Sequence, residues 1–140
     1  MRIALDTDAF IAATRSATGA SREILLMIER GEIEAVMTVP MLIEYEAVLK
    51  RPAHLAAAHL TVEQADNIIK TLAGVLVRVA VRFSWRPQLA DANDEMILEA
   101  AVNGHADAIV TFNTRHYTEA APHFGVAVLK PGELLRSMQP

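Results

Sequence analysis

The chain contains no cysteine, which excludes disulfides, zinc–thiolate sites and a cysteine nucleophile. It also lacks a long hydrophobic run. The longest apolar stretch, residues 72–81, is interrupted by Arg78, so no segment is predicted to cross a membrane. No basic segment leads into an apolar stretch at the N-terminus, so no secretory signal is expected. These absences fit a protein of the reducing cytoplasm.

Several motifs of common enzyme and binding-protein classes are missing as well. Gly19 is isolated and forms no glycine-rich phosphate loop, so nucleotide binding is not expected. The five histidines show no metal-ligand spacing, and no glycines form a nucleophile elbow for Ser–His–Asp catalysis. The net charge of −4 argues against bulk electrostatic binding of nucleic acid. It does not exclude a nuclease, because bound cations invert the field of an acidic pocket.

The 140 residues, of which 52% are hydrophobic, suit one domain that spans residues 1–140 and buries a sheet. Short, continuously apolar runs predict buried strands at residues 3–5, 35–39, 75–81, 108–111 and 126–129. Periodic apolar patterns with capping residues predict helices at residues 21–30, 40–51, 61–74 and 91–104, and a short one after Gly132.

The cap of the first helix is assigned to Ser21 and that of the third to Thr61, and Gly31 is expected to end the first helix. Residues 82–89 are expected to form a connecting loop. Strands that alternate with helices indicate a parallel sheet covered on both faces. The predicted fold is therefore a single three-layer α/β/α sandwich with a mainly parallel sheet of four to five strands.

Three acids stand where apolar segments end, break or begin: Asp6, Glu44 and Asp94. Clustered carboxylates repel one another, and a divalent cation between them makes the cluster tolerable. Ligands bind at the carboxyl ends of strands in such sheets, where Asp6 and Asn113 are predicted to lie. The sequence therefore suggests an acidic pocket that binds Mg²⁺ or Mn²⁺.

Each acid also has a structural interpretation. Asp6 is explained by hydrogen bonds to turn amides, and Asp8 or Asp91 by capping of a helix. Asp94 suits both capping and a pocket. Glu44 lies on an apolar helix face, where a cation such as the nearby Lys50 is expected to pair with it.

Five segments resemble the PIN-domain family, in the same order along the whole chain. They are Leu-Asp-Thr-Asp at 5–8, the Glu-Tyr segment at 42–52, Asp-Ala-Asn-Asp at 91–94, Ala-Asp-Ala-Ile-Val-Thr-Phe-Asn at 106–113 and the closing segment at 128–135. The Glu-Tyr segment is the most specific of them. It is similar to a branch assigned to the toxins of toxin–antitoxin pairs, like the VapC-type ribonucleases.

The resemblance implies a metal-dependent nuclease that hydrolyses single-stranded RNA with Mg²⁺ or Mn²⁺. It implies catalytic and metal-binding roles for Asp6, Glu44 and Asp94. Asn113 stands where the family has a fourth acid, so the site would have one negative charge fewer; Asp8 stands where the family usually has asparagine. Possible auxiliary residues are Thr7, Asp8, Asp91 and Thr111. Candidates for RNA contacts are Arg15, Lys50, Arg51 and Arg115. Implied partners are RNA, a cognate antitoxin protein and a second copy in a dimer.

Two alternatives stay open. The loss of the fourth acid at Asn113 is compatible with a weak or inactive PIN-like domain that binds RNA or a protein partner. Asp6-Thr7-Asp8 also resembles the start of haloacid-dehalogenase-type phosphatases, but Phe10 replaces the expected Thr or Val and Lys70 lacks a matching context. His116 is interpreted as a loop residue, because the implied mechanism needs no histidine.

Overall fold

The computed structural model describes residues 1–82, 84, 89 and 91–139. In this part of the chain, five parallel strands form one sheet in the order β3-β2-β1-β4-β5. The strands are β1 (Arg2–Leu5), β2 (Glu34–Met37), β3 (Val77–Arg78), β4 (Ala108–Val110) and β5 (Ala127–Leu129). The predicted parallel sheet is therefore confirmed.

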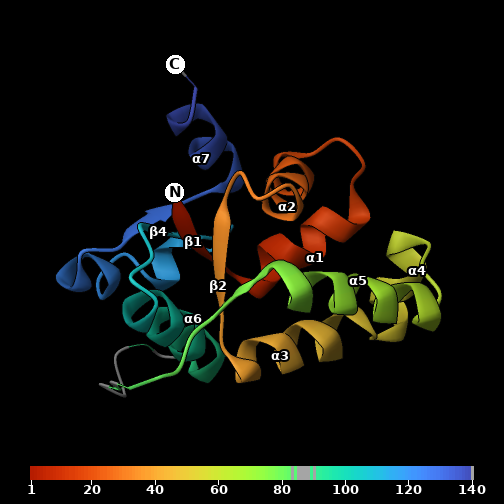
Figure 1. The fold of residues 1–140 in the computed structure, drawn as a ribbon, viewed down its shortest axis with the longest axis horizontal. Helices are drawn as coiled ribbons and strands as arrows, with labels where there is room; N and C mark the ends of the chain where they lie inside the picture. The colour runs from red at the N-terminus through yellow and green to blue at the C-terminus, as the bar shows by residue number, and fades with distance from the viewer. Residues whose placement is uncertain (83, 85–88, 90, 140) are drawn as a thin grey trace.

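Helices connect the strands and cover both faces of the sheet (Figure 1). The α-helices are α1 (Thr7–Arg15), α2 (Ala20–Glu29), α3 (Val39–Leu49), α4 (Pro52–Ala58), α5 (Val62–Val75), α6 (Ala92–Asn103) and α7 (Pro131–Ser137). Two 3₁₀ helices, η1 (Thr114–His116) and η2 (Ala121–Phe124), lie between β4 and β5. Helix α6 packs against β1, β2 and β4, while α1 packs against α2 and α3 on the other side of the sheet (Figure 1). The α/β/α sandwich is confirmed.

The strand order changes direction between β1 and β4. From β1 the chain crosses to β2 and then β3, and it returns through α6 to β4 on the opposite side of β1. The loops that follow β1 and β4 therefore diverge at the carboxyl edge of the sheet. In open parallel sheets this is where ligands bind.

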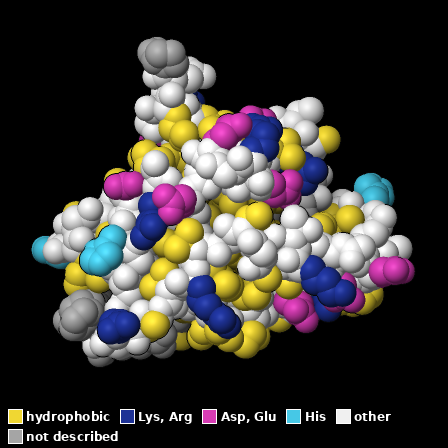
Figure 2. All heavy atoms as spheres, in the orientation of Figure 1, with side chains coloured by type: hydrophobic (Ala, Val, Ile, Leu, Met, Phe, Trp, Pro, Cys, Tyr) yellow, Lys and Arg dark blue, Asp and Glu magenta, His cyan; other side chains and the backbone are white. Residues whose placement is uncertain are grey.

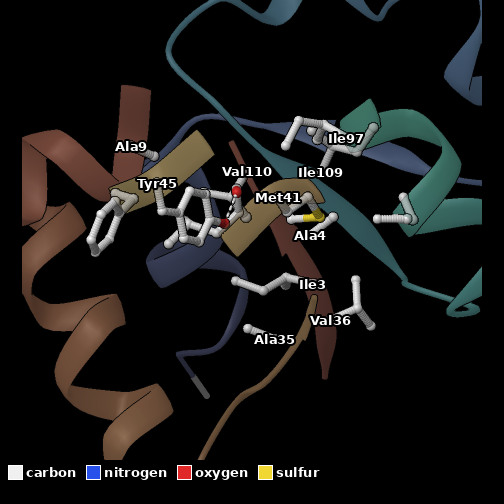
Figure 3. Packing of buried hydrophobic residues seen from close by; sticks show 14 of the residues in the cluster. Ile3, Ala4, Ala9, Ala35, Val36, Met41, Tyr45, Ile97, Ile109 and Val110 are labelled. Carbon is white, nitrogen blue, oxygen red and sulfur yellow. Dashed lines mark hydrogen bonds between the residues drawn. The ribbon is translucent and has the colours of Figure 1, made fainter. Parts of the chain in front are cut away.

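The core lies around β1, the central strand (Figure 3). Ile3 and Ala4 are fully buried between β2 and β4, and Ile109 on β4 is equally inaccessible. The rings of Phe10 and Tyr45 stack with their centroids 4.6 Å apart, which ties α1 to α3. Burial of such continuous apolar strands is the main stabilising contribution to the fold, and it holds the carboxyl ends of β1 and β4 rigidly side by side.

Several helix ends agree with the sequence. Thr61 caps α5 in a capping box with Gln64, as its spacing from the apolar stripe predicted. Asp91 caps α6, and its side chain accepts a hydrogen bond from the backbone N–H of Asn93. Gly31 follows α2 with a φ of 78°, a left-handed conformation in which glycine is favoured.

Other boundaries differ from the prediction. Helix α2 begins at Ala20 with Gly19 as its cap. Ser21 is buried in the first turn, where its hydroxyl has no hydrogen-bond partner among the described residues. Thr38, predicted within a strand, instead caps α3. The helix expected at residues 40–51 is present as α3, which ends at Leu49, but a further short helix that was not expected, α4, begins at Pro52.

Helix α1 and β3 also depart from the sequence pattern. The apolar residues 9–13 belong to α1, a helix that the sequence pattern does not predict, and the side chain of Asp6 caps it. Strand β3 has only two residues, although an apolar run predicted seven. Of the predicted loop at 82–89, residues 83 and 85–88 lie outside the described residues. None of the helices in the described part of the chain is long and apolar enough to span a membrane.

Candidate functional site

The candidate site lies at the carboxyl edge of the sheet, where β1 and β4 end. Asp6 follows β1 directly, and Thr111 follows β4. The backbone N–H of Asp6 donates to the carbonyl of Val110 at 2.9 Å, which continues the ladder beyond the assigned strands. This pairing holds the side chains of Asp6 and Thr111 together, although 105 positions separate them in the sequence.

Asp6 is buried and receives three hydrogen bonds. The hydroxyls of Thr111 and Tyr117 donate to Oδ2 at 2.8 and 3.0 Å, and the backbone N–H of Thr7 donates to Oδ1 at 2.8 Å. Burial, followed by the negative charge of Asp8, raises the pKa of Asp6 to about 6, although all three hydrogen bonds oppose the shift. Within the described residues, the groups that lower the pKa of Asp6 are these neutral donors, and burial outweighs them.

Asp94 approaches the same point from the first turn of α6. Its side chain is buried, and the hydroxyl of Tyr117 lies 3.0 Å from its Oδ1. On its other side, Nδ1 of His116 lies 3.0 Å from Oδ2. The two carboxylates of Asp6 and Asp94 thus converge on one buried hydroxyl. Burial and the charges of these two acids raise the pKa of Tyr117 well above its usual range, so this hydroxyl stays protonated.

Asp8 and Asn113 form a second polar pair next to this cluster. Asn113 Nδ2 donates to Asp8 Oδ2 at 3.0 Å, and the backbone N–H of Phe112 donates to the same oxygen at 3.0 Å. Burial raises the pKa of Asp8. Asn113 therefore turns its amide N–H₂ toward Asp8, and its side chain acts as a donor that orients this carboxylate.

Glu44 lies on α3 and is half-buried. The next residue, Tyr45, is fully buried, and its hydroxyl donates to the carbonyl of Leu5, so α3 is anchored at the end of β1. Helix α3, which carries Glu44, is therefore held against the carboxyl end of β1. Glu44 does not complete a three-ligand cluster with Asp6 and Asp94, because no three Asp, Glu or His side chains within the described residues are grouped to hold a metal ion.

A cleft of about 820 Å³ opens beside Asp94. Its lining comes from the residues before α6, the first turn of α6 and the η1 segment: Leu89, Asp91, Ala92, Asp94, Arg115, His116 and Glu119. Arg115 thus lies in the same cleft as an acid of the site. Among the predicted auxiliary residues, Asp91 lines this cleft, but its carboxylate also caps α6.

The other candidates for RNA contacts do not line this cleft. Arg15 contacts His54 and lines a second pocket, which Thr7 and Asp8 also line. Lys50 forms ion pairs with Glu46 and Asp66. It therefore does not serve as the partner considered for Glu44. Arg51 is exposed at the start of α4.

Sequence reasoning missed Tyr117 and set aside His116. His116, interpreted as a loop residue, instead ends the 3₁₀ helix η1, and its ring contacts Asp94. Tyr117 follows η1 and is completely buried. One feature of the sequence could have indicated Tyr117: it is a tyrosine a few residues after a predicted strand. When a tyrosine is buried, its hydroxyl usually finds a polar partner.

The donor set fits a divalent cation in its chemistry. Asp6 and Asp94 offer oxygen ligands, which Mg²⁺ and Mn²⁺ prefer. The Tyr117 hydroxyl between the two acids has only one proton to donate to them. A buried carboxylate with a raised pKa is stabilised in its charged form by a nearby cation. The fit rests on the two converging carboxylates of Asp6 and Asp94.

Comparison with known proteins agrees with this geometry. The sequence model of the PIN-domain family matches residues 2–115 of this chain. The chain therefore belongs to the PIN-domain family, which is the class that the parallel sheet and its acidic edge resemble. No curated protein matches the sequence.

Among solved structures, the chain is similar to one in the crystal structure of VapBC2 from Rickettsia felis bound to a DNA fragment from their promoter. The TM-score is 0.63 at 15% sequence identity, and the match covers 91% of this chain and 97% of the other. At this identity the similarity establishes the shared fold.

Proposed function

We propose that the protein is a metal-dependent endoribonuclease that hydrolyses phosphodiester bonds of single-stranded RNA. The observation that carries this proposal is the convergence of buried Asp6 and Asp94 on one hydroxyl at the switch point of the sheet. Membership of the PIN-domain family supports a nuclease. The raised pKa of Asp6 supports a site that requires positive charge.

Asp6 and Asp94 would hold a Mg²⁺ or Mn²⁺ ion, with Glu44 reaching it directly or through water and Asn113 as an outer ligand. Such an ion activates water and stabilises negative charge on phosphate oxygens. Thr111 and the Thr7 amide keep the carboxylate of Asp6 oriented. Asn113 and the Phe112 amide hold Asp8 beside it.

The RNA would lie in the cleft beside Asp94. Arg115 is the best-placed of the four basic candidates, because it lines this cleft together with His116. A guanidinium matches the geometry of a phosphate group. Arg15, Lys50 and Arg51 are left as weaker candidates, and Lys50 is already engaged in ion pairs.

The biological role that we propose is that of a toxin in a toxin–antitoxin pair, acting in the cytoplasm. The similarity in fold to a chain of the VapBC2 complex supports it. A cognate antitoxin protein would then be a partner, and the active form would be a dimer. Co-expression with the product of the adjacent gene tests this role: growth inhibition by the protein alone, relieved by that product, is expected.

The activity is tested with purified protein and labelled single-stranded RNA, in Mn²⁺ or Mg²⁺ and in EDTA. Asp6→Asn keeps the cap of α1 but removes the negative charge. We expect cleavage that requires metal and is lost in Asp6→Asn. Equal cleavage by both proteins would show that the nuclease is a contaminant or that the site is misplaced.

A second candidate function is RNA or protein binding without cleavage. It is favoured by the side chain of Asn113, which donates to Asp8 and adds no charge to the cluster. RNA binding in EDTA that is unchanged by Asp94→Asn, with no cleavage in any metal, would support this function and contradict the nuclease.

A further inference from the structure

The hydroxyl of Tyr117 lies between the two acids of the site. Its oxygen is 3.0 Å from Asp6 Oδ2 and 3.0 Å from Asp94 Oδ1. A tyrosine hydroxyl has one proton to donate, so it satisfies only one of the two carboxylates at a time. The other carboxylate oxygen then faces the hydroxyl oxygen with no proton between them.

The surrounding chain holds Tyr117 firmly in this position. Its backbone N–H donates to Thr114, its carbonyl accepts from Ala121, and the side chain is completely buried. The hydroxyl of Thr111 accepts from the backbone N–H of Asn113 at 2.9 Å, which shapes the start of the same loop. Tyr117 is therefore held between the acids by its loop.

A divalent cation would need the same oxygen atoms. Asp6 Oδ2 already accepts from the hydroxyls of Thr111 and Tyr117, and a carboxylate oxygen has only two lone pairs. A cation bound to this oxygen must therefore displace one of the two hydroxyls. Tyr117 is the one that also faces Asp94, so a cation held between the two acids costs the protein the hydrogen bond of Tyr117.

We propose that Tyr117 is a positioning residue that holds Asp6 and Asp94 together without metal and competes with the divalent cation for them. The inference rests on the proposed function for the presence of a cation site. Without the hydroxyl, the two carboxylates face each other with no donor between them. Their repulsion in the metal-free protein is then larger, and a cation relieves more of it.

The test is direct binding of Mn²⁺, followed by electron paramagnetic resonance of the free ion in the absence of RNA. Tyr117→Phe should bind Mn²⁺ about tenfold more tightly than the unaltered protein, the factor that corresponds to ~1.4 kcal/mol. Tyr45→Phe is the matched control. It also removes a buried tyrosine hydroxyl, but one that donates to a backbone carbonyl, so its Mn²⁺ affinity should not change.

Each outcome of this experiment supports or contradicts the competition between Tyr117 and the cation, the proposed ribonuclease activity, or both. Unchanged or weaker binding by Tyr117→Phe would overturn the competition, as would an equal gain in Tyr45→Phe. Tighter binding without RNA cleavage by any protein would support the competition and contradict the ribonuclease. Metal-dependent cleavage with unaltered Mn²⁺ affinity in Tyr117→Phe would support the ribonuclease and contradict the competition. Failure of all three proteins to bind Mn²⁺ would overturn both.

A second measurement does not depend on the stability of Tyr117→Phe. Addition of Mg²⁺ to the unaltered protein should change the ultraviolet absorbance of a tyrosine, because the hydroxyl loses its carboxylate partners. Tyr45→Phe should retain this difference spectrum. A spectrum that stays the same up to saturating Mg²⁺ would overturn the inference.

Discussion

Strand β1 has a charged side chain near each end, Arg2 at its amino end and Asp6 just beyond its carboxyl end. Arg2 is neutralised by opposite charge: its Nη2 lies 2.9 Å from Glu34, and its Nη1 donates to the carbonyl of Gly104 at 2.9 Å. Asp6 is surrounded by hydroxyl and amide donors that carry no formal charge.

The two ends differ in exposure as well. Glu34 is more than half exposed, whereas Asp6 and Asp94 are buried. Where acidic and basic side chains are visible on the surface, many lie next to each other (Figure 2). At the amino end, the charges of Arg2 and Glu34 neutralise each other in contact with solvent, so no further ligand is needed there. A buried acid such as Asp6 that is supplied with neutral donors is costly, and perturbed acids of this kind are concentrated at functional sites.

The largest expected effect is on the rate of RNA cleavage, which should depend on the acids at the carboxyl edge and not on the acid at the amino end. Asp94→Asn should reduce metal-dependent RNA cleavage by about a hundredfold or more, since altering even outer partners of a metal costs about 10–100-fold. Glu34→Gln removes an acid at the opposite end and should leave the rate unchanged. Initial rates at saturating Mn²⁺ measure both. Similar losses in both variants would contradict the assignment of the site to the carboxyl edge.

The next effect is the pH dependence of stability. The pKa of Asp6 is about 6 in the folded chain against 3.8 for a free aspartate side chain, so the folded state binds its proton more tightly. Ionisation should lower the free energy of unfolding by about 3 kcal/mol between pH ~4 and ~6, with no further loss above that range.

Asp6→Asn should remove this loss and stabilise the protein at neutral pH. Urea unfolding of both proteins at several pH values, in EDTA, measures the difference. If the two stability curves run parallel between pH ~4 and ~6, Asp6 does not have the raised pKa.

A smaller effect is expected from Thr111→Val, which keeps the shape but loses the hydroxyl. Thr111 donates to Asp6 and accepts from the N–H of Asn113. Leaving both partners unsatisfied should cost about 1–3 kcal/mol of stability at neutral pH. It should also raise the pKa of Asp6 further, because this hydrogen bond lowers it.

Thr14→Val is the control for that measurement. Its hydroxyl donates to the carbonyl of Ile11 within α1, so its loss should not change the pH dependence. A titration of Asp6 followed by NMR distinguishes the two variants, and an unchanged pKa in Thr111→Val would contradict the role of this hydrogen bond.

The smallest effect is expected at the amino end. Glu34→Gln removes the ion pair with Arg2, whose side chains are 34% and 56% exposed. Exposed pairs contribute about 0–1 kcal/mol, so urea unfolding should change by no more than that. A loss of several kcal/mol would show that the amino end depends on its charges as strongly as the carboxyl end does.

Much of the fold was predictable from local sequence. Continuous apolar runs at Ile3 and Ala108 indicated central strands, and the Thr61 and Asp91 caps depend on residues within one turn of each other. The prediction failed where neighbours in space override local pattern. Ser21 is buried in α2 although its chemistry suits a cap, and β3 pairs through only two residues.

The sequence by itself determined the parallel α/β/α fold and the presence of acids at strand and helix ends, because both follow from patterns within a few residues. Tertiary structure alone decided that Tyr117 joins Asp6 to Asp94 and that Asn113 turns its amide to Asp8. These contacts connect positions 23 to 111 residues apart. Such pairings depend on how the sheet and its loops pack, and no local periodicity in the chain encodes them.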